Sequence, residues 1–393
     1  MRRFGLLLVL TAACASPAVQ SPSPAASVMA AGGPYKVLRS ARVGGEGGTD
    51  YINAEPATRR LYITRNAVRA VPATATTPEV AAVPGRVSVF DLDNLNLIGE
   101  VINGGGNGAV ADPKSGHGFA SSAPLSMFDT KTLKMMTTID PNADTPPPAQ
   151  QFQKDGIYFD DFNDRVYIFS HPTKNAIVLD SHNGNVIGKI DLGGVPEQAV
   201  GDGKGTLYVV MQDAQGSVAV VDVKTMKTTA HYPFDGQGSC NGLGLDVKNK
   251  ILFAACARTS VPGAPAPTPG ATPPPPNPTM VILSAVDGKI LAKLPLAGSS
   301  DGAVFNPATN EAFSAHGNGT LTIVKEMSPT RFEVEQNLNT MNGARTLTLD
   351  TKTGRIFVMS VERGAAPPPP PGGGRGGQAP VIPGSFTIVM VGK

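Results

Sequence analysis

The sequence contains no tryptophan and only three cysteines among its 393 residues, and its charges nearly cancel. There are 33 lysines and arginines against 31 aspartates and glutamates, which gives a formal net charge of +2 at pH 7. A balanced chain has no overall field that attracts a polyanion, so net charge gives no support to a nucleic-acid-binding protein. Helical spacing of apolar residues is missing over nearly all the chain beyond the N-terminus, which argues against a helical fold.

Short catalytic and cofactor motifs are missing as well. The chain has no nucleophile-elbow, zinc-protease, haem-attachment or nucleotide P-loop pattern. Its glycine-rich segments, 104–108 and 372–377, do not lie between a strand and a helix, so neither is a phosphate-binding loop. His171 and His316 have no metal-like spacing, and we expect both to be solvated loop residues. The sequence therefore predicts no catalytic residue and leaves any metal or cofactor unknown.

A repeat of short strands is the main pattern that the sequence does contain. In residues 196–229, runs rich in β-branched and aromatic residues alternate with turns of Gly, Asp and Asn. An aromatic residue marks the second strand of each of seven such units. These markers are Tyr62, Phe119, Tyr167, Tyr208, Phe253, Phe313 and Phe357. Successive gaps of 41 and 45 residues, and a last gap of 44, match the length of one four-stranded propeller blade.

A second row lies seven residues before each marker and begins the predicted hairpin turn. Six of its seven members are Asp, Asn or Glu, and an Asx side chain there can bond the backbone two residues further on. The row consists of Glu55, Asp112, Asp160, Gly201, Asp246, Asn306 and Asp350. Two rows at a fixed offset over seven units predict an all-β fold, a seven-bladed β-propeller.

Residues 203–233, GKGTLYVVMQDAQGSVAVVDVKTMKTTAHYP, and residues 352–361, KTGRIFVMSV, resemble the YVTN-type repeat of the YncE-like seven-bladed β-propeller family. The resemblance covers residues 35–392. It implies the propeller fold but supplies no catalytic motif, because the family's repeat is a structural one. The chain departs from the repeat at Gly201, in the third strand of the sixth blade and in its long proline-rich inserts.

The first 20 residues have the features of a targeting segment. Arg2 and Arg3 precede an apolar run, 4–13, that is too short to cross a bilayer. Residues 11–14 resemble a bacterial lipobox, which would place a lipid on Cys14, whereas residues 13–15 match an ordinary A-x-A cleavage site. Both patterns predict export to the periplasm or cell surface, with membrane attachment only through such a lipid. Residues 21–34, rich in Ala, Ser and Pro, are then expected to be a disordered linker.

The propeller is predicted to extend over residues 35–393. Its last blade lacks a fourth strand at the C-terminus, and the alternating segment 35–43 is predicted to supply that strand and close the ring. The alternative is a loose N-terminal extension. We expect the closed ring to be a monomer.

Four inserts interrupt the repeat, at 67–85, 140–150, 259–278 and 363–384. Three lie between second and third strands and one lies between blades, and in a propeller both kinds of connection are on the same face. We favour a lid or partner-docking rim over the alternative of neutral linkers, because independent insertions would not all be expected on one face. Their composition predicts mobile or polyproline-like loops.

On this same face, a polar residue lies at the entry to each innermost strand. It lies twelve residues before the aromatic marker of its blade, except in the fourth blade, where it is one residue closer to the marker. We expect these residues to surround the mouth of the channel, where a ligand would bind. They are Asp50, Asn107, Asp155, Glu197, Asn241, Asp301 and Arg345. The carboxylates outnumber the single cation, so a divalent cation or an amine-bearing ligand would fit. The alternative is that Asp and Asn recur because they cap local backbone.

Cys240 and Cys256 are an even pair in an oxidising compartment and flank one hairpin. If Asp246 faces Lys250, the two cysteines are directly opposite and close enough for a disulfide. If Asp246 faces Ile251, the register turns Cys256 to the other face of the sheet. The sequence leaves both registers open.

The sequence favours an exported propeller that binds a small ligand, a peptide or a protein partner at the insert-bearing face. One alternative is a propeller enzyme, either lactonase-like or lyase-like, or similar to a subunit of a quinoprotein dehydrogenase. Another is a structural protein of the cell surface. An enzyme is expected to gather asymmetric acid–base groups with shifted pKa values in the mouth, whereas a scaffold shows only the symmetric ring.

Overall fold

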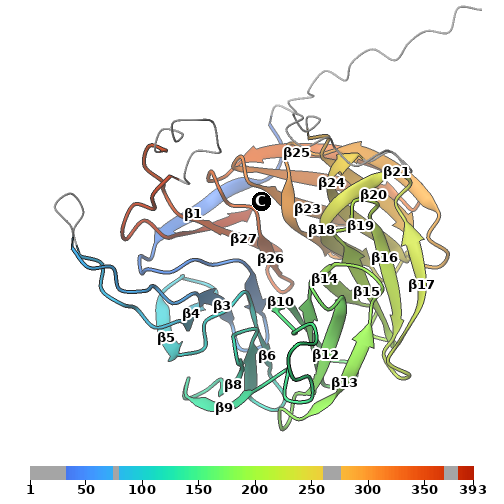
Figure 1. Ribbon diagram of the computed structural model, residues 1–393. Coiled ribbons are helices and arrows are strands. Elements are labelled where there is room, and N and C mark those ends of the chain that lie inside the picture. The colour runs from blue at the N-terminus through green and yellow to red at the C-terminus, as the bar shows by residue number, and fades with distance from the viewer. Residues whose placement is uncertain (1–31, 74–78, 260–275, 367–378) are drawn as a thin grey trace, which may run out of the picture.

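The computed structural model describes residues 32–73, 79–259, 276–366 and 379–393. These form seven four-stranded antiparallel sheets arranged as blades around a common axis (Figure 1). The predicted all-β, seven-bladed β-propeller is confirmed. The predicted targeting segment, Cys14 and most of the linker lie outside the described residues. Within the described ranges, no helix is long and apolar enough to cross a membrane.

Each blade runs from an inner strand at the axis to an outer strand at the rim. The first blade contains β2 (Ile52–Glu55), β3 (Arg60–Arg65), β4 (Arg86–Asp91) and β5 (Leu97–Ile102). The second contains β6 (Ala109–Asp112), β7 (His117–Ala120), β8 (Leu125–Asp129) and β9 (Met135–Ile139). The third contains β10 (Lys154–Asp160), β11 (Arg165–Ser170), β12 (Asn175–Asp180) and β13 (Val186–Asp191).

The remaining blades follow the same order, except that the last one takes its outer strand from the N-terminus. The fourth contains β14 (Pro196–Gly201), β15 (Thr206–Met211), β16 (Ser217–Asp222) and β17 (Lys227–Pro233). The fifth contains β18 (Gln237–Asp246), β19 (Ile251–Thr259), β20 (Thr279–Ser284) and β21 (Ile290–Pro295). The sixth contains β22 (Ser300–Asn306), β23 (Glu311–His316), β24 (Thr320–Ser328) and β25 (Arg331–Asn339). The seventh contains β26 (Leu347–Asp350), β27 (Arg355–Ser360), β28 (Thr387–Gly392) and β1 (Lys36–Arg42).

A carboxylate or amide side chain organises the turn between the first and second strands of six blades. In the second blade, Asp112 Oδ1 accepts a hydrogen bond of 2.8 Å from the backbone nitrogen of Lys114. The same bond to the residue two positions on is made by Glu55, Asp160, Asp246, Asn306 and Asp350. The repeated acidic row in the sequence is therefore a row of turn caps.

A contact between the third and fourth blades explains why Gly201 occupies the turn-cap position in the fourth blade. The hydroxyl of Tyr158 in the third blade accepts a hydrogen bond of 2.9 Å from Gly201 N. A Cβ atom on Gly201 would lie 2.8 Å from that hydroxyl oxygen, which is too close. The capping role moves by one residue, to Asp202, whose Oδ1 accepts a hydrogen bond of 2.7 Å from Lys204 N.

The seven aromatic markers are buried and help to form the hydrophobic cores. One core joins Tyr167 and Phe169 of β11 to Val209 of β15, so it lies between the third and fourth blades. Another joins Phe357 of β27 to Ile63 of β3, between the last and first blades. Because each sheet buries its faces against its neighbours, no blade has a complete core of its own.

The N-terminal strand closes the ring, as predicted. β1 pairs antiparallel with β28, so the first and the last described strands share one blade (Figure 1). Tyr35 exchanges two backbone-to-side-chain hydrogen bonds with Gln336, at 3.0 and 2.9 Å. Its hydroxyl also donates to Glu311, which pairs with the Lys393 ammonium at 2.9 Å. The first and last strands are thus both fastened to the sixth blade.

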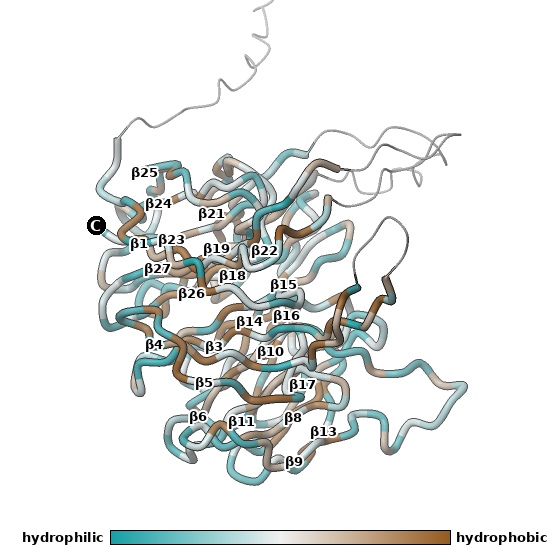
Figure 2. Tube along the Cα trace, turned by 90° about the vertical axis from the view of Figure 1, so that its left-hand side faces the viewer, coloured by the Kyte–Doolittle hydropathy of each residue, from teal (hydrophilic) through white to brown (hydrophobic). Residues whose placement is uncertain are grey.

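The described parts of the inserts are more ordered than the composition predicted. The connection after β3 continues as a narrow ladder, in which Val68 pairs with Val83 and Val71 pairs with Val80. In the connection after β9, Asn142 exchanges two hydrogen bonds with the backbone of Phe152, at 2.7 and 3.2 Å. Both connections extend from the same side of the disc (Figure 2). Residues 74–78, 260–275 and 367–378 of the inserts lie outside the described residues.

Candidate functional site

The seven polar residues at the entries of the inner strands form one connected group, which we call the mouth ring. Asp155, Glu197, Asn241 and Asp301 lie in the inner strands β10, β14, β18 and β22. Asp50, Asn107 and Arg345 each lie two residues before the strand that follows, which is β2, β6 or β26. Their described side-chain contacts join neighbouring blades, which supports a shared site more than local capping of backbone.

One half of the mouth ring is held by Arg345. Its guanidinium lies 2.6 Å from Asp301 Oδ2 and 3.9 Å from Asp50 Oδ1. Asn241 Nδ2 donates to the other oxygen of Asp301 at 2.9 Å. Asn107 Nδ2 lies 3.3 Å from Asp50 Oδ2, so the chain of contacts continues into the second blade.

The other half is built around Asp155. Asn107 Nδ2 donates to Asp155 Oδ1 at 2.5 Å, and the Lys154 ammonium donates to Asn107 Oδ1 at 2.5 Å. His171 Nε2 lies 2.7 Å from Asp155 Oδ2 and 3.3 Å from Glu197 Oε1. The mouth ring therefore runs from Asn241 through Arg345 and Asn107 to Glu197 without a break.

The expectation that His171 and His316 are solvated is wrong. His171 is half-buried between two carboxylates of the mouth ring. His316 is fully buried in β23, and its Nε2 lies 2.9 Å from the Thr322 hydroxyl. The sequence argument looked for metal-like spacing along the chain, but the partners of His171 come from β10 and β14 across the blades.

Three functional residues were therefore missed from the sequence: Tyr51, His171 and Gln212. Tyr51 donates to Glu197 Oε2 at 2.8 Å, and Gln212 Nε2 donates to Glu197 Oε1 at 2.5 Å. His171 and Gln212 each follow their aromatic marker by four residues, in adjacent blades. That shared offset of polar residues at the end of the second strand is the signal that could have found them.

Burial and charge shift the pKa values of several groups in the mouth. Burial, followed by repulsion from Asp155 and Asp301, raises the pKa of Asp50 to about 6. The side chain of Asp155, followed by that of Glu197, raises the pKa of His171 to about 10, so this imidazole is protonated at neutral pH. Burial also raises the pKa of Glu197 and lowers the pKa of the Lys154 ammonium.

Two cavities adjoin the mouth ring. A cavity of about 1000 Å³ includes Asp50 and Arg345 in its wall, together with Val68, Arg363 and Ile382 from the described bases of two inserts. A second cavity, of about 720 Å³, follows the inner strands through the disc and includes Tyr51 and Glu197. Its wall also includes apolar side chains such as Ile157 and Leu245.

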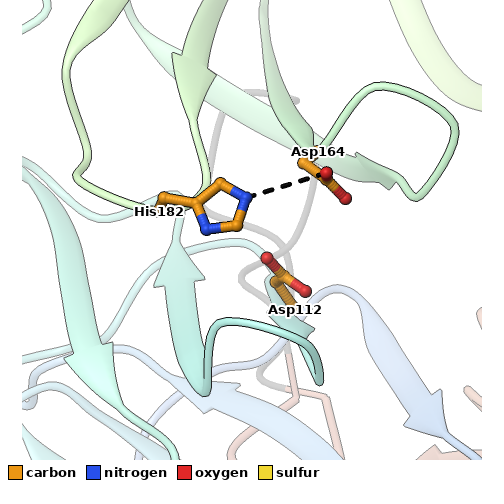
Figure 3. A group of neighbouring side chains, drawn as sticks. All are labelled: Asp112, Asp164 and His182. Atoms are coloured by element: carbon orange, nitrogen blue, oxygen red, sulfur yellow. Dashed lines mark ion pairs between the residues drawn. The ribbon is translucent and has the colours of Figure 1, made fainter.

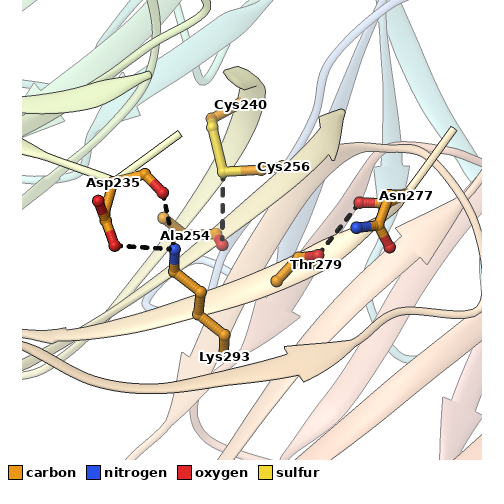
Figure 4. Close-up of a disulfide and its surroundings, with 7 residues drawn as sticks. All are labelled: Asp235, Cys240, Ala254, Cys256, Asn277, Thr279 and Lys293. Carbon is orange, nitrogen blue, oxygen red and sulfur yellow. Dashed lines mark hydrogen bonds and ion pairs between the residues drawn. A yellow bond between two sulfur atoms is a disulfide. The ribbon is translucent and has the colours of Figure 1, made fainter. Parts of the chain in front are cut away.

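A β-bulge beside a disulfide places Asn241 in the mouth ring. The turn pairs Asp246 with Ile251, which is the register that would turn Cys256 away. A bulge just after Cys240 shifts the pairing by one residue, so Cys240 and Cys256 are opposite each other after all. They form a disulfide with Cα atoms 3.8 Å apart (Figure 4). The bulged residue is Asn241, whose amide contacts Asp301.

A second group of potential metal ligands lies between the second and third blades, at the hairpin turns of the opposite face. It consists of Asp112, Asp164 and His182 (Figure 3). The two oxygens of Asp112 accept hydrogen bonds from Lys114 N and the Ser181 hydroxyl. The Lys114 ammonium pairs with Asp164 at 2.8 Å. These contacts clamp two blades together, and they leave little ligand capacity for an ion.

Comparison with known proteins shows the fold alone. No family model and no curated protein matches the chain. Among solved structures it is similar to Kuenenia stuttgartiensis hydrazine synthase, with a TM-score of 0.61 and 13% identity over 78% of this chain and 91% of that chain. It is also similar to a chain of a mitotic checkpoint complex, with a TM-score of 0.62 and 8% identity over 89% of this chain and 96% of that chain. The chain therefore belongs to the structural class of seven-bladed β-propellers.

Proposed function

We propose that this protein is an exported binding scaffold of the YVTN-repeat type, which holds an amine-bearing ligand at the mouth of its channel. The observation that carries this proposal is the continuous mouth ring beside a cavity of about 1000 Å³ on the insert-bearing face. A concave site with a few convergent polar groups is where a propeller usually binds its ligand. Export is supported by the basic and apolar pattern of residues 1–13.

Asp50 is the carboxylate that would receive the ammonium group. It lines the cavity, whereas Asp301 is neutralised by the closer contact with Arg345. The contacts of Asp50 to Arg345 and Asn107 are long, at 3.9 and 3.3 Å. Burial, followed by repulsion from Asp155 and Asp301, raises the pKa of Asp50, and a bound cation would stabilise its ionised form.

Apolar side chains beside Asp50 would receive the rest of the ligand. The same cavity includes Met341, Met359 and Val361, and methionine adapts to ligands of varied shape. The described base of the last insert adds the exposed aliphatic residues Val381 and Ile382. The insert-bearing rim therefore supports an amphipathic amine, such as a peptide N-terminus with apolar side chains.

A thermal-shift panel tests this proposal. The full chain is heated with short peptides that carry a free N-terminus, and with the same peptides after N-acetylation. A ligand that binds only the folded state raises the melting temperature, because it stabilises that state by about 2.7 kcal/mol at 100 times its dissociation constant. We expect at least one free peptide to stabilise the protein and its acetylated form to have no effect.

Two carboxylate variants locate the binding. Asp50→Asn should abolish the stabilisation, whereas Asp161→Asn, which removes an exposed carboxylate on the opposite face, should leave it unchanged. An equal effect of free and acetylated peptides, or unchanged stabilisation of Asp50→Asn, would contradict the proposal.

An enzyme is the second candidate, because the acid–base groups of the mouth are distributed asymmetrically. Asp155, His171, Glu197 and Tyr51 gather on one side, the other side has the neutralised group of Asn241, Asp301 and Arg345, and Asp50 lies between the two. Shifted pKa values in such a cluster are typical of catalytic sites. Hydrolysis of small lactones that is lost in Asp155→Asn but retained in Asp161→Asn would support this candidate; its absence would favour the scaffold.

A further inference from the structure

Asp155, His171 and Glu197 bring three potential metal ligands to one point of the mouth ring. Asp155 lies in β10, Glu197 lies in β14, and His171 directly follows β11. One oxygen of each carboxylate and one nitrogen of the imidazole lie within 4.8 Å of one another. Because these atoms come from two blades, a bound ion would also bridge the third and fourth blades.

Neighbouring donors orient both carboxylates toward this point. Asn107 occupies Asp155 Oδ1, which leaves Oδ2 toward His171. Tyr51 donates to Glu197 Oε2, while Oε1 accepts a hydrogen bond from Gln212 and also faces His171, at 3.3 Å. Hydrogen-bonding partners of this kind orient metal ligands and commonly change metal affinity about 10–100-fold when they are removed.

His171 Nε2 supplies an independent observation. This nitrogen is buried and has no aligned hydrogen bond, although Asp155 Oδ2 is 2.7 Å away. A buried polar atom normally makes a hydrogen bond, so it is unusual that this nitrogen lies close to a carboxylate oxygen without one. This nitrogen lies between the two carboxylates, where a metal ion would take the place of the proton that the imidazole holds at neutral pH. The imidazole is 34% exposed, so the position is open to the mouth.

We propose that Asp155, His171 and Glu197 bind one divalent transition-metal ion, of the class to which Zn²⁺ belongs. One imidazole nitrogen and two carboxylate oxygens suit this class, whereas Ca²⁺ prefers six to eight oxygen ligands. Three protein ligands leave a coordination position open for water or a ligand group. The metal site uses the same mouth as the proposed ligand, and it deepens that proposal by adding a second attachment point.

Calorimetric titration with ZnCl₂ tests the site on the full, untagged chain after removal of metal with a chelator. We expect one ion per chain in the wild type. His171→Gln and Glu197→Gln should each weaken binding by at least about tenfold, because each removes a ligand or its geometry. CaCl₂ should bind at least about tenfold more weakly than ZnCl₂.

Two matched variants separate this site from other acidic groups. His182→Gln removes the histidine of the second cluster, and Asp235→Asn removes an exposed carboxylate outside the mouth ring. Neither should change zinc affinity by more than about twofold. Loss of zinc binding in His182→Gln with retention in His171→Gln would overturn the proposal, as would the absence of any binding by the wild type.

Crystallography covers the case in which a ligand variant does not fold. Anomalous scattering at the zinc edge should show one peak among Asp155, His171 and Glu197 of the wild type, and a peak elsewhere alone would overturn the assignment.

The results of the two experiments distinguish failure of the metal site from failure of the proposed amine ligand. Peptide stabilisation without zinc binding would reject the metal site and retain the scaffold, whereas zinc binding without peptide stabilisation would reject the proposed amine ligand.

Discussion

His316 is a buried base whose protonation opposes folding. It is fully buried in β23, and burial lowers its pKa from 6.5 to about 4. Below its unfolded pKa the unfolded chain binds a proton that the folded chain does not bind. The stability associated with the neutral imidazole is therefore complete above pH 6.5 and is lost as the pH falls toward 4.

His316→Gln should make the protein less sensitive to acid. The pKa shift corresponds to about 3 kcal/mol of stability lost by the wild type between neutral pH and pH 4. Denaturant unfolding at pH 7.5 and pH 4.5 should show a smaller loss in the variant than in the wild type. Equal losses would mean that His316 titrates normally in the folded protein.

Gly201 is a second position at which a single contact is expected to determine the stability of a variant. Gly201→Ala places a methyl group 2.8 Å from the Tyr158 hydroxyl oxygen, so we expect a loss of about 1–3 kcal/mol in unfolding free energy. In a Tyr158→Phe background the clash is absent, and the same alanine should cost much less. A cost that does not depend on residue 158 would show that this contact is not the reason for glycine.

The strand β1 completes the last blade by pairing with β28. Its removal would expose the edge of β28 and take away the Gln336 and Glu311 contacts of Tyr35. An exposed edge in a blade with an incomplete core favours aggregation.

Deletion of residues 35–43 should therefore abolish cooperative melting or cause aggregation. Arg39→Ala, at an exposed position of the same strand, is the control and should melt like the wild type. Scanning calorimetry and light scattering measure both effects. A deletion variant that melts like the full protein would show that β1 does not close the ring.

The hairpin of β18 and β19 is the element that the disulfide stabilises. Cys240 and Cys256 are 16 residues apart, and a loop of this length corresponds to about 3 kcal/mol in the chain-entropy model. The double variant Cys240→Ala/Cys256→Ala should lose stability of this order while keeping the propeller fold. Intact mass after alkylation in denaturant should show no reactive thiol at either position, and two alkylated cysteines would rule out the bridge.

The seven-bladed ring could be predicted from the sequence because two rows of residues, the turn caps and the aromatic markers, repeat along the chain. The aromatic markers recur in all seven blades and the turn caps in six, so strand order and ring closure follow from the spacing. The bulge after Cys240 was not predicted, because the spacing of turn caps and aromatic markers does not show where a strand takes up an extra residue; the sixth blade has the same shift between Ser300 and Gly302. His171 was missed for a related reason, since its partners are distant in sequence and depend on how adjacent blades are placed.

The charge distribution of the whole molecule agrees with a site confined to one face. The net charge is only +2, yet the mouth ring places four carboxylates around the channel entrance. Local concentration of one sign in a concave site attracts cations without a large net charge. The proposed binding scaffold therefore depends on the arrangement of the blades and not on overall composition.

A high-resolution crystal structure of the protein purified from its native host tests binding at the mouth most directly. We predict density at the insert-bearing mouth that contacts Asp50, with an ammonium-like group within hydrogen-bond distance of its carboxylate. Water alone at the mouth, together with a bound molecule only in the opening on the opposite face, would contradict the proposed binding face.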